Sequence, residues 1–248
     1  MPPRLNLFTN RERANSFGGA AQNYDTFRPR YPDQLIDDVL APGARRVLEA
    51  GAGTGIASLQ MIERGAELLA VEPDARMAAV AQAKGIPVEI ATFEQWEPAG
   101  RTFDRVVFAA SFHWVDPAVA LPKIRQVLDD GGKLALIWNR LRPTKPTRAE
   151  FESIYQNYMN IETHRHDGNP NEIVDRLAAA GFTVTQQRYP HDLHYSAQQW
   201  VDIAFTFSNQ LLVAADKAAE LRARLVDRIG SAGVSVGGDA VAILATPA

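Results

Sequence analysis

The stretch VLEAGAGTGIASL, residues 47–59, places three glycines within five positions, between two apolar runs. RRVLEA (45–50) is typical of a short buried strand. IASLQMIERG (56–65) has apolar residues at helical spacing and ends at a glycine. The glycines therefore lie in a strand-to-helix turn, where they permit positive φ and let a ligand approach the backbone. We expect this turn to bind a ligand.

The segments on either side of the turn alternate between strand-like and helix-like patterns from about residue 33. Apolar runs such as VVFAA and LALI favour strands that are covered on both faces. The expected strands span 45–50, 67–73, 87–93, 103–111, 133–139, 183–196 and 240–246. The expected helices span 32–41, 56–65, 74–85, 117–132, 151–162, 170–182, about 196–208 and about 215–230. This alternation predicts an α/β fold: a doubly wound, Rossmann-like, seven-stranded and mostly parallel sheet with helices on both faces.

Two kinds of segment stand outside this alternation. FGGAAQNYDTFRPRYP (17–32) is rich in aromatic and arginine residues, and we interpret residues 1–32 as an N-terminal lid. The main domain then spans 33–248. It carries substrate-side insertions at about 140–170 and 196–230, the first of which is a helical insertion after the fifth strand.

Composition narrows the possible functions. The 248 residues include 26 basic and 29 acidic side chains, a formal charge of -3, and no cysteine. These values disfavour nucleic acid as a partner and exclude a disulfide scaffold or a cysteine nucleophile. No apolar stretch reaches the ~20 residues that span a bilayer, so we expect no membrane association and a cytoplasmic location. THRHDG (163–168) lacks the further spaced ligands of a metal site, and we expect no metal.

The glycine spacing distinguishes between ligands. A dinucleotide-binding turn, G-x-G-x-x-G, would have its third glycine at position 56, where this chain has Ile56. The pattern is instead E-x-G-x-G-x-G, and Glu72 follows Gly51 by 21 residues at the end of the next expected strand. An acid at that distance is placed to accept hydrogen bonds from ribose hydroxyls. The alternative is that Glu72 caps the helix beginning at Asp74.

The string from Glu49 to Gly55 resembles the first motif of the class I S-adenosylmethionine-dependent methyltransferases. The S-F-H-W-V-D-P string (111–117) is similar to a methyltransferase type 11-like, small-molecule subgroup that includes relatives of trans-aconitate methyltransferase. The resemblance implies S-adenosylmethionine as cofactor, S-adenosylhomocysteine as product and a small-molecule methyl acceptor. The cofactor-binding residues that it implies are Glu49, Gly51, Ala52, Gly53, Gly55, Glu72, Pro73, Met77, Thr92, Phe93, Glu94, Ala110, Tyr24 and Arg28.

The expected adenine contact departs from the family pattern. Many members carry an acid and a small residue where this chain has Thr92 and Phe93. The Phe93 backbone N–H can serve a ring nitrogen, and Glu94 is a candidate substitute for the acid. The alternative for Phe93 and Trp96 is ordinary core packing. In the lid, Arg28, and after it Arg30, are the candidates to hold the methionine carboxylate, because a guanidinium binds a carboxylate bidentately. The alternative is that both arginines are solvated surface residues beside turn prolines.

The acceptor side is expected to include Tyr31, His113, Trp114, Trp138 and Tyr155. His113 is the candidate general base for a hydroxyl acceptor, whereas a carboxylate acceptor needs none. The alternative for His113 is a structural histidine. We expect O-methyl transfer to a carboxylate or hydroxyl by a monomer or homodimer. The alternatives are an NAD(P)-binding oxidoreductase and a non-catalytic S-adenosylmethionine-binding module.

Overall fold

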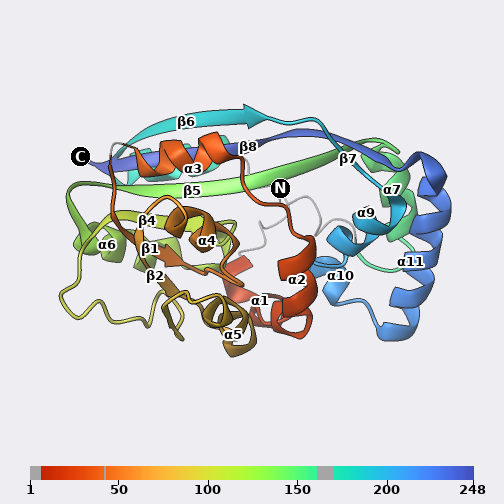
Figure 1. Cartoon of the computed structure of the whole chain (residues 1–248), viewed down its shortest axis with the longest axis horizontal. Helices are drawn as coiled ribbons and strands as arrows, with labels where there is room; N and C mark the ends of the chain where they lie inside the picture. The colour runs from red at the N-terminus through yellow and green to blue at the C-terminus, as the bar shows by residue number, and fades with distance from the viewer. Residues whose placement is uncertain (1–6, 42, 161–169) are drawn as a thin grey trace.

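The computed structural model describes residues 7–41, 43–160 and 170–248, and it has an α/β architecture built on one sheet (Figure 1). The strands are β1 (Arg46–Ala50), β2 (Glu67–Val71), β3 (Val88–Glu89), β4 (Phe103–Ala109), β5 (Leu128–Lys145), β6 (Phe182–Pro190), β7 (Leu193–Tyr195) and β8 (Val234–Pro247). The sheet order is β3-β2-β1-β4-β5-β8-β6, and β7 pairs with β8 outside that path. The pairs among β1 to β5 are parallel, whereas β8 runs antiparallel to its three neighbours. The doubly wound, mostly parallel sheet is thereby confirmed.

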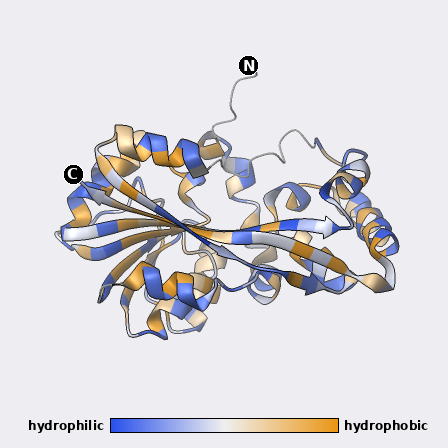
Figure 2. Cartoon of the chain, turned by 90° about the horizontal axis from the view of Figure 1, so that it is seen from above, coloured by the Kyte–Doolittle hydropathy of each residue, from blue (hydrophilic) through white to orange (hydrophobic). Residues whose placement is uncertain are grey.

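Helices cover both faces of this sheet (Figure 2). One face packs against α3 (Asp33–Leu40), α4 (Ile56–Ile62) and α5 (Ala75–Ala83). The other face packs against α6 (Pro117–Val127) and α8 (Pro170–Ala179). Side chains alternate along each strand, so Val47 faces the first group of helices and Leu48 the second. This burial on both faces explains the continuous apolar runs of the sequence.

The remaining helices form a lobe at the far end of β5 and β8 (Figure 1). They are α7 (Arg148–Tyr155), α9 (Ala197–Ala204), α10 (Ser208–Leu211) and α11 (Ala215–Ile229). α7, α9 and α11 share a hydrophobic core with β7 and the first residues of β8. The N-terminal segment, with α1 (Arg11–Ala14), η2 (Phe17–Ala20) and α2 (Ala21–Phe27), lies between this lobe and α5.

The structure corrects several expected boundaries. The helix expected over 117–132 ends at Val127, because Leu128 is extended and pairs with Phe103 in the sheet. The stretch after Asn139 was expected to be irregular, but β5 continues to Lys145 because β8 begins at Val234 and supplies an antiparallel partner. The strand expected over 87–93 is reduced to two residues, and the one expected over 183–196 is divided into β6 and β7.

Candidate active site

The glycine turn joins β1 to α4, and its three glycines all have positive φ: +69° at Gly51, +60° at Gly53 and +81° at Gly55. Two of them are also required by close packing. A Cβ on Gly51 would lie 2.6 Å from the Ser111 Cβ, and a Cβ on Gly55 would lie 2.3 Å from the Ile86 Cδ1. A Cβ on Gly53 would meet the Met77 Cε at 3.4 Å. Neighbouring strands and helices therefore impose part of the glycine pattern, in addition to any ligand.

Glu49 is the last residue but one of β1, just before this turn, and it is buried, with 1% exposed. Ser58 on α4 donates a hydrogen bond to its Oε2. Glu49 lines the main cavity, and its Oε1 is buried without a hydrogen-bond partner within the described residues. Burial raises the pKa of Glu49 to about 8, and Glu72 adds a smaller repulsion. An unpartnered buried carboxylate oxygen at a cavity is suited to a cationic ligand group.

Glu72 follows β2 and is buried beside the same turn, with 7% exposed. Its Oε2 accepts a hydrogen bond from the Gly53 N–H at 2.8 Å, and its Oε1 accepts one from the Asp74 N–H at 2.9 Å. The helix α5 is capped by the Asp74 side chain, which accepts from the backbone of Arg76 and Met77. Capping therefore does not account for Glu72. Burial raises the pKa of its carboxyl, and the two N–H donors oppose that shift.

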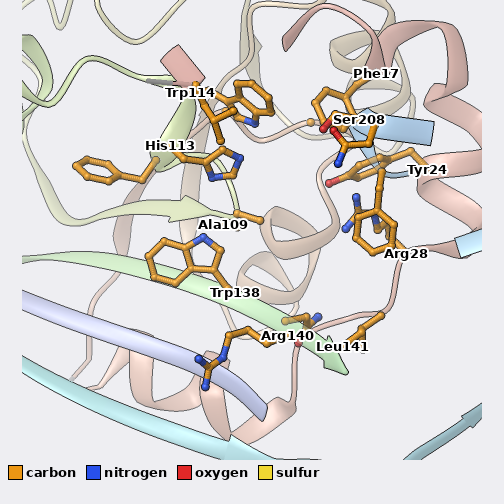
Figure 3. Close-up of a pocket in the computed structure, with 18 of the residues that line it drawn as sticks. Phe17, Tyr24, Arg28, Ala109, His113, Trp114, Trp138, Arg140, Leu141 and Ser208 are labelled. Atoms are coloured by element: carbon orange, nitrogen blue, oxygen red, sulfur yellow. The ribbon is translucent and has the colours of Figure 1, made fainter. Parts of the chain in front are cut away.

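A cavity of about 560 Å³ opens at the carboxyl ends of β1 and β4 (Figure 3). One wall is formed by the glycine turn, η3 (Phe112–Trp114) and β5. The opposite wall comes from the N-terminal segment and α10, which place Phe17, Tyr24, Arg28 and Ser208 across the cavity from His113 and Trp138. Much of the lining is aromatic: Phe8, Phe17, Tyr24, Tyr31, Phe112, Trp114, Trp138, Phe151, Tyr155, Trp200 and Phe207.

Several contacts fasten the N-terminal segment to the Rossmann-like body, and two of them lie close to the glycine turn. The fully buried Gln60 side chain exchanges two hydrogen bonds with the Tyr31 backbone, at 2.9 and 2.8 Å. Lys84 on α5 forms an ion pair with Asp25 and donates to the Thr54 carbonyl of the glycine turn at 2.9 Å. The segment is thus anchored to the elements that hold the glycines.

Arg28 is held over the cavity by contacts from both sides. Its guanidinium lies 4.9 Å from the Tyr24 ring centroid and 4.1 Å from that of Phe207, and its Nη2 donates to the Thr206 carbonyl at 3.1 Å. Its Nε is buried and has no partner within the described part of the chain. Arg30, by contrast, forms an exposed ion pair with Glu63.

The chain enters η3 through Ala110, a non-glycine residue with a positive φ of 55°. Such conformations cluster at functional sites. The Ala110 N–H donates to the Ile137 carbonyl, and the Ser111 hydroxyl donates to the Ala50 carbonyl at 2.5 Å. These bonds direct His113 and Trp114 toward the cavity, where their ring centroids lie 4.8 Å apart.

The structure brings together most, but not all, of the predicted site residues. Those that line the cavity are Glu49, Gly51, Ala52, Gly53, Ala110, Tyr24, Arg28, Tyr31, His113, Trp114, Trp138 and Tyr155. Those that do not line it are Gly55, Glu72, Pro73, Met77, Thr92, Phe93 and Glu94. The second group lies in the glycine turn, directly after β2, on α5 and in the loop that follows β3, and its role in holding a cofactor stays a prediction.

The loop 92–96 is held by core packing and by hydrogen bonds within the protein. Phe93 and Trp96 are buried in the main core and stack with centroids 6.2 Å apart. Lys123 on α6 donates to the carbonyls of Phe93, Glu94 and Trp96. The core-packing alternative therefore describes both aromatic side chains, while the Glu94 carboxylate accepts from the Asp116 N–H at 3.0 Å.

Sequence reasoning missed several polar residues of the cavity: Arg13, Asn139, Arg140, Arg148, Glu152, Glu172, Arg176, Ser208, Asn209 and Gln210. Arg13 and Ser208 are 195 positions apart and meet only because α1 packs against α10. The arginine-rich composition of the N-terminal segment was the one sequence feature that pointed to this region. The partners of these arginines could not be predicted, because they belong to the lobe.

Two expected absences concern metals and membranes. His164, His166 and Asp167 lie outside the described residues. Across 7–41, 43–160 and 170–248, three or more potential ligands do not gather at one place. In those same ranges, the helices are too short or too polar to span a bilayer.

Known proteins with similar sequences are methyltransferases by name. A family model described as "Methyltransferase domain" matches residues 48–136. A methyltransferase of Mycobacterium tuberculosis (strain H37Rv) is 41% identical over 197 residues, which cover 71% of this chain and 80% of that protein. A malonyl-[acyl-carrier protein] O-methyltransferase of Herminiimonas arsenicoxydans is 29% identical over 194 residues, covering 75% of this chain and 69% of that protein.

Solved structures show the same fold at low sequence identity. A type II methyltransferase structure from Anaeromyxobacter dehalogenans has a TM-score of 0.60 and 21% identity, covering 89% of this chain and 98% of that one. The Haemonchus contortus phosphoethanolamine N-methyltransferase 2, in complex with phosphomonomethylethanolamine and S-adenosylhomocysteine, has a TM-score of 0.55 and 15% identity, covering 97% of this chain and 59% of that one. With the sequence relatives and the acid-flanked glycine turn, these findings show that the chain belongs to the methyltransferase family and is an S-adenosylmethionine-dependent enzyme.

Proposed function

We propose that this enzyme transfers a methyl group to an oxygen, of a carboxylate or a hydroxyl, on a small molecule bound in the 560 Å³ cavity. The observation that carries the proposal is the continuity of that cavity. It connects the unpartnered Oε1 of Glu49 at the glycine turn with the aromatic walls around His113 and Trp138. A pocket of this size and lining suits a compact organic acceptor.

The residues present fit S-adenosylmethionine. The Glu49 Oε1 and the Arg28 Nε are both buried without a described partner, and their opposite charges match the ammonium and carboxylate of a methionine group. Both Glu72 oxygens already accept one N–H each, and each retains a lone pair for a ribose hydroxyl. When bound, the cofactor supplies an electrophilic methyl group on a sulfonium.

The chain's own contribution is to bind, orient and exclude water. The aromatic walls and the anchored N-terminal segment restrict the acceptor, and holding reacting atoms at roughly 3–3.5 Å supplies much of the rate in such transfers. His113 is exposed within the cavity on η3, so it is placed to accept the proton of a hydroxyl acceptor. A carboxylate acceptor is already ionised and requires no base.

The oxygen assignment is supported by the Herminiimonas arsenicoxydans relative, which is named as a malonyl-[acyl-carrier protein] O-methyltransferase. The small-molecule assignment is supported by the size and the largely aromatic lining of the cavity. Residues of the N-terminal segment and α10 lie across it from His113 and Trp138 (Figure 3).

The test is transfer of a labelled methyl group from S-adenosylmethionine to a panel of carboxylic acids, phenols and alcohols. We expect labelled ester or ether products. With a hydroxyl acceptor, His113→Asn should lower kcat by about 10²-fold or more and remove a pH-dependent limb of the rate. With a carboxylate acceptor, the same variant should leave the pH profile unchanged. Transfer to nitrogen or carbon acceptors alone, or to macromolecules alone, would overturn the proposal.

A further inference from the structure

Arg13 is a buried cation on the wall of the cavity that the N-terminal segment and α10 form. Its residue is 9% exposed, its Nε donates to the Ser208 hydroxyl at 2.7 Å, and it lines the cavity. Its two terminal nitrogens form no hydrogen bond to any residue in the ranges that the structure describes. Two other cavity arginines are compensated, since Arg140 pairs with Asp239 and Arg148 with Glu152.

An uncompensated buried guanidinium is costly to fold. Burial lowers the pKa of Arg13, which shows the direction of that cost. Fastening α1 to α10 through Ser208 would need only a neutral donor. Nearby on α10, Gln210 is 4% exposed, and its Oε1 also has no partner within the described residues. The region is therefore polar, enclosed and incompletely satisfied.

The charges of the bound cofactor sharpen this observation. If Arg28 holds the methionine carboxylate and Glu49 the ammonium, the sulfonium and Arg13 both place positive charge at the same cavity. An anionic acceptor would compensate them, whereas a neutral or cationic acceptor would not.

We infer that Arg13, together with Ser208, forms a subsite that binds a carboxylate of the methyl acceptor. The inference rests on the proposed function. The bound carboxylate is an anchor, because a guanidinium that occupies its lone pairs lowers its nucleophilicity, and the methylated oxygen belongs to another group of the same molecule. The aromatic lining around Phe17, Trp114 and Phe207 predicts an apolar or aromatic body between the two groups.

The test measures binding of simple probes to the full chain saturated with S-adenosylhomocysteine. Ligand-observed NMR titrations compare 3-phenylpropanoate and hexanoate with their uncharged amides. We expect the carboxylates to bind the wild type, and the amides to bind roughly ten-fold more weakly or worse, as for a charge-assisted hydrogen bond. Arg13→Met should weaken carboxylate binding by a similar factor, and Arg13→Lys should retain part of it.

Arg176→Met is the matched control, because Arg176 lines the cavity but is exposed on α8. This variant should bind the probes with the affinity of the wild type. Ser208→Ala keeps the charge and checks that the fold tolerates loss of the α1 to α10 bond. Equal binding of carboxylate and amide, no carboxylate binding at all, or an Arg13→Met variant that binds as the wild type does, would overturn the inference. The affinity for S-adenosylhomocysteine is measured for the wild type and for every variant. A wild type that does not bind S-adenosylhomocysteine would refute the proposed function rather than this inference.

Discussion

At the scale of single residues, the cavity is marked by charged side chains that have buried polar atoms without a hydrogen-bond partner within the described residues. Glu49 and Arg28 both line the cavity, and each has a buried polar atom without a described partner. Buried polar atoms in native structures are nearly always satisfied, so such exceptions point to a ligand.

Glu49 should make cofactor binding depend on pH. Its pKa of about 8 means that the carboxyl is protonated at neutral pH in the free protein, whereas a bound ammonium requires the carboxylate. Affinity for S-adenosylhomocysteine should therefore rise with pH, by up to about ten-fold per unit below pH 8, and level off above it. Calorimetry at pH 7 in buffers of different ionisation enthalpy should detect proton release on binding.

Glu49→Gln provides the comparison. The amide resembles the protonated carboxyl, so the variant should fold, bind S-adenosylhomocysteine more weakly at pH 8.5, and lose the pH dependence. The free energy of unfolding of the wild type should also fall as the pH rises from 4.5 to 8, because Glu49 keeps a proton in the folded state that the unfolded state has released. Stability in that window should be flatter for Glu49→Gln. A wild-type affinity that does not change between pH 6 and 8.5 would contradict this account.

At the scale of elements, the glycine turn is determined as much by its neighbours as by its ligand. Gly55→Ala would place a methyl group 2.3 Å from the Ile86 Cδ1 in a conformation with φ of +81°. We expect a loss of about 2–4 kcal/mol in the free energy of unfolding, from the left-handed backbone and overpacking together. Urea titration gives this value.

Gly65→Ala is the matched control. Gly65 also has a positive φ, of +86°, but a Cβ there would meet nothing within 4 Å. Its loss should be about 1 kcal/mol, from the backbone alone. If both variants lose the same stability, packing against Ile86 does not select glycine at position 55.

At the scale of the whole molecule, the cavity exists because two cores and the N-terminal segment meet. The sheet with its flanking helices forms one body, and the lobe on the extended β5 and β8 carries its own hydrophobic cluster (Figure 1). The N-terminal segment closes the space between them, and the Lys84–Asp25 ion pair is one of its anchors.

Lys84→Met should loosen that segment. Both side chains of the pair are 23% exposed, so the ion pair is less screened than a surface pair. We expect amide hydrogen exchange in α2 to accelerate by roughly ten-fold and S-adenosylhomocysteine to bind more weakly. Hydrogen-exchange mass spectrometry checks the first effect.

Arg30→Met tests the same connection at an exposed pair. Arg30 and Glu63 also join the N-terminal segment to the body, but their side chains are 55% and 45% exposed. This variant should change neither exchange nor affinity measurably. Equal effects of the two variants would show that Lys84 has no special role as an anchor.

The sequence by itself determined the strand-to-helix turn at Gly51–Gly55, the acid at Glu72 and the alternation of strands and helices, because these depend on local periodicity and on backbone conformations that few residues adopt. Through the resemblance to a family, it also named Arg28 and His113 as site residues, and both line the cavity. It could not fix where β5 ends, because that depends on pairing with β8 about 100 positions later.

Only the tertiary structure decided the acceptor side of the cavity. Arg13, Ser208 and Gln210 belong to no motif of the sequence. They stand out because the fold buries them, and because polar atoms of Arg13 and Gln210 lack hydrogen-bond partners within the described residues. Likewise, Phe93 resolved to a core residue because α6 and β4 enclose its side chain. Local patterns encode conformation, whereas the desolvation of a charge depends on the whole set of segments that surround it.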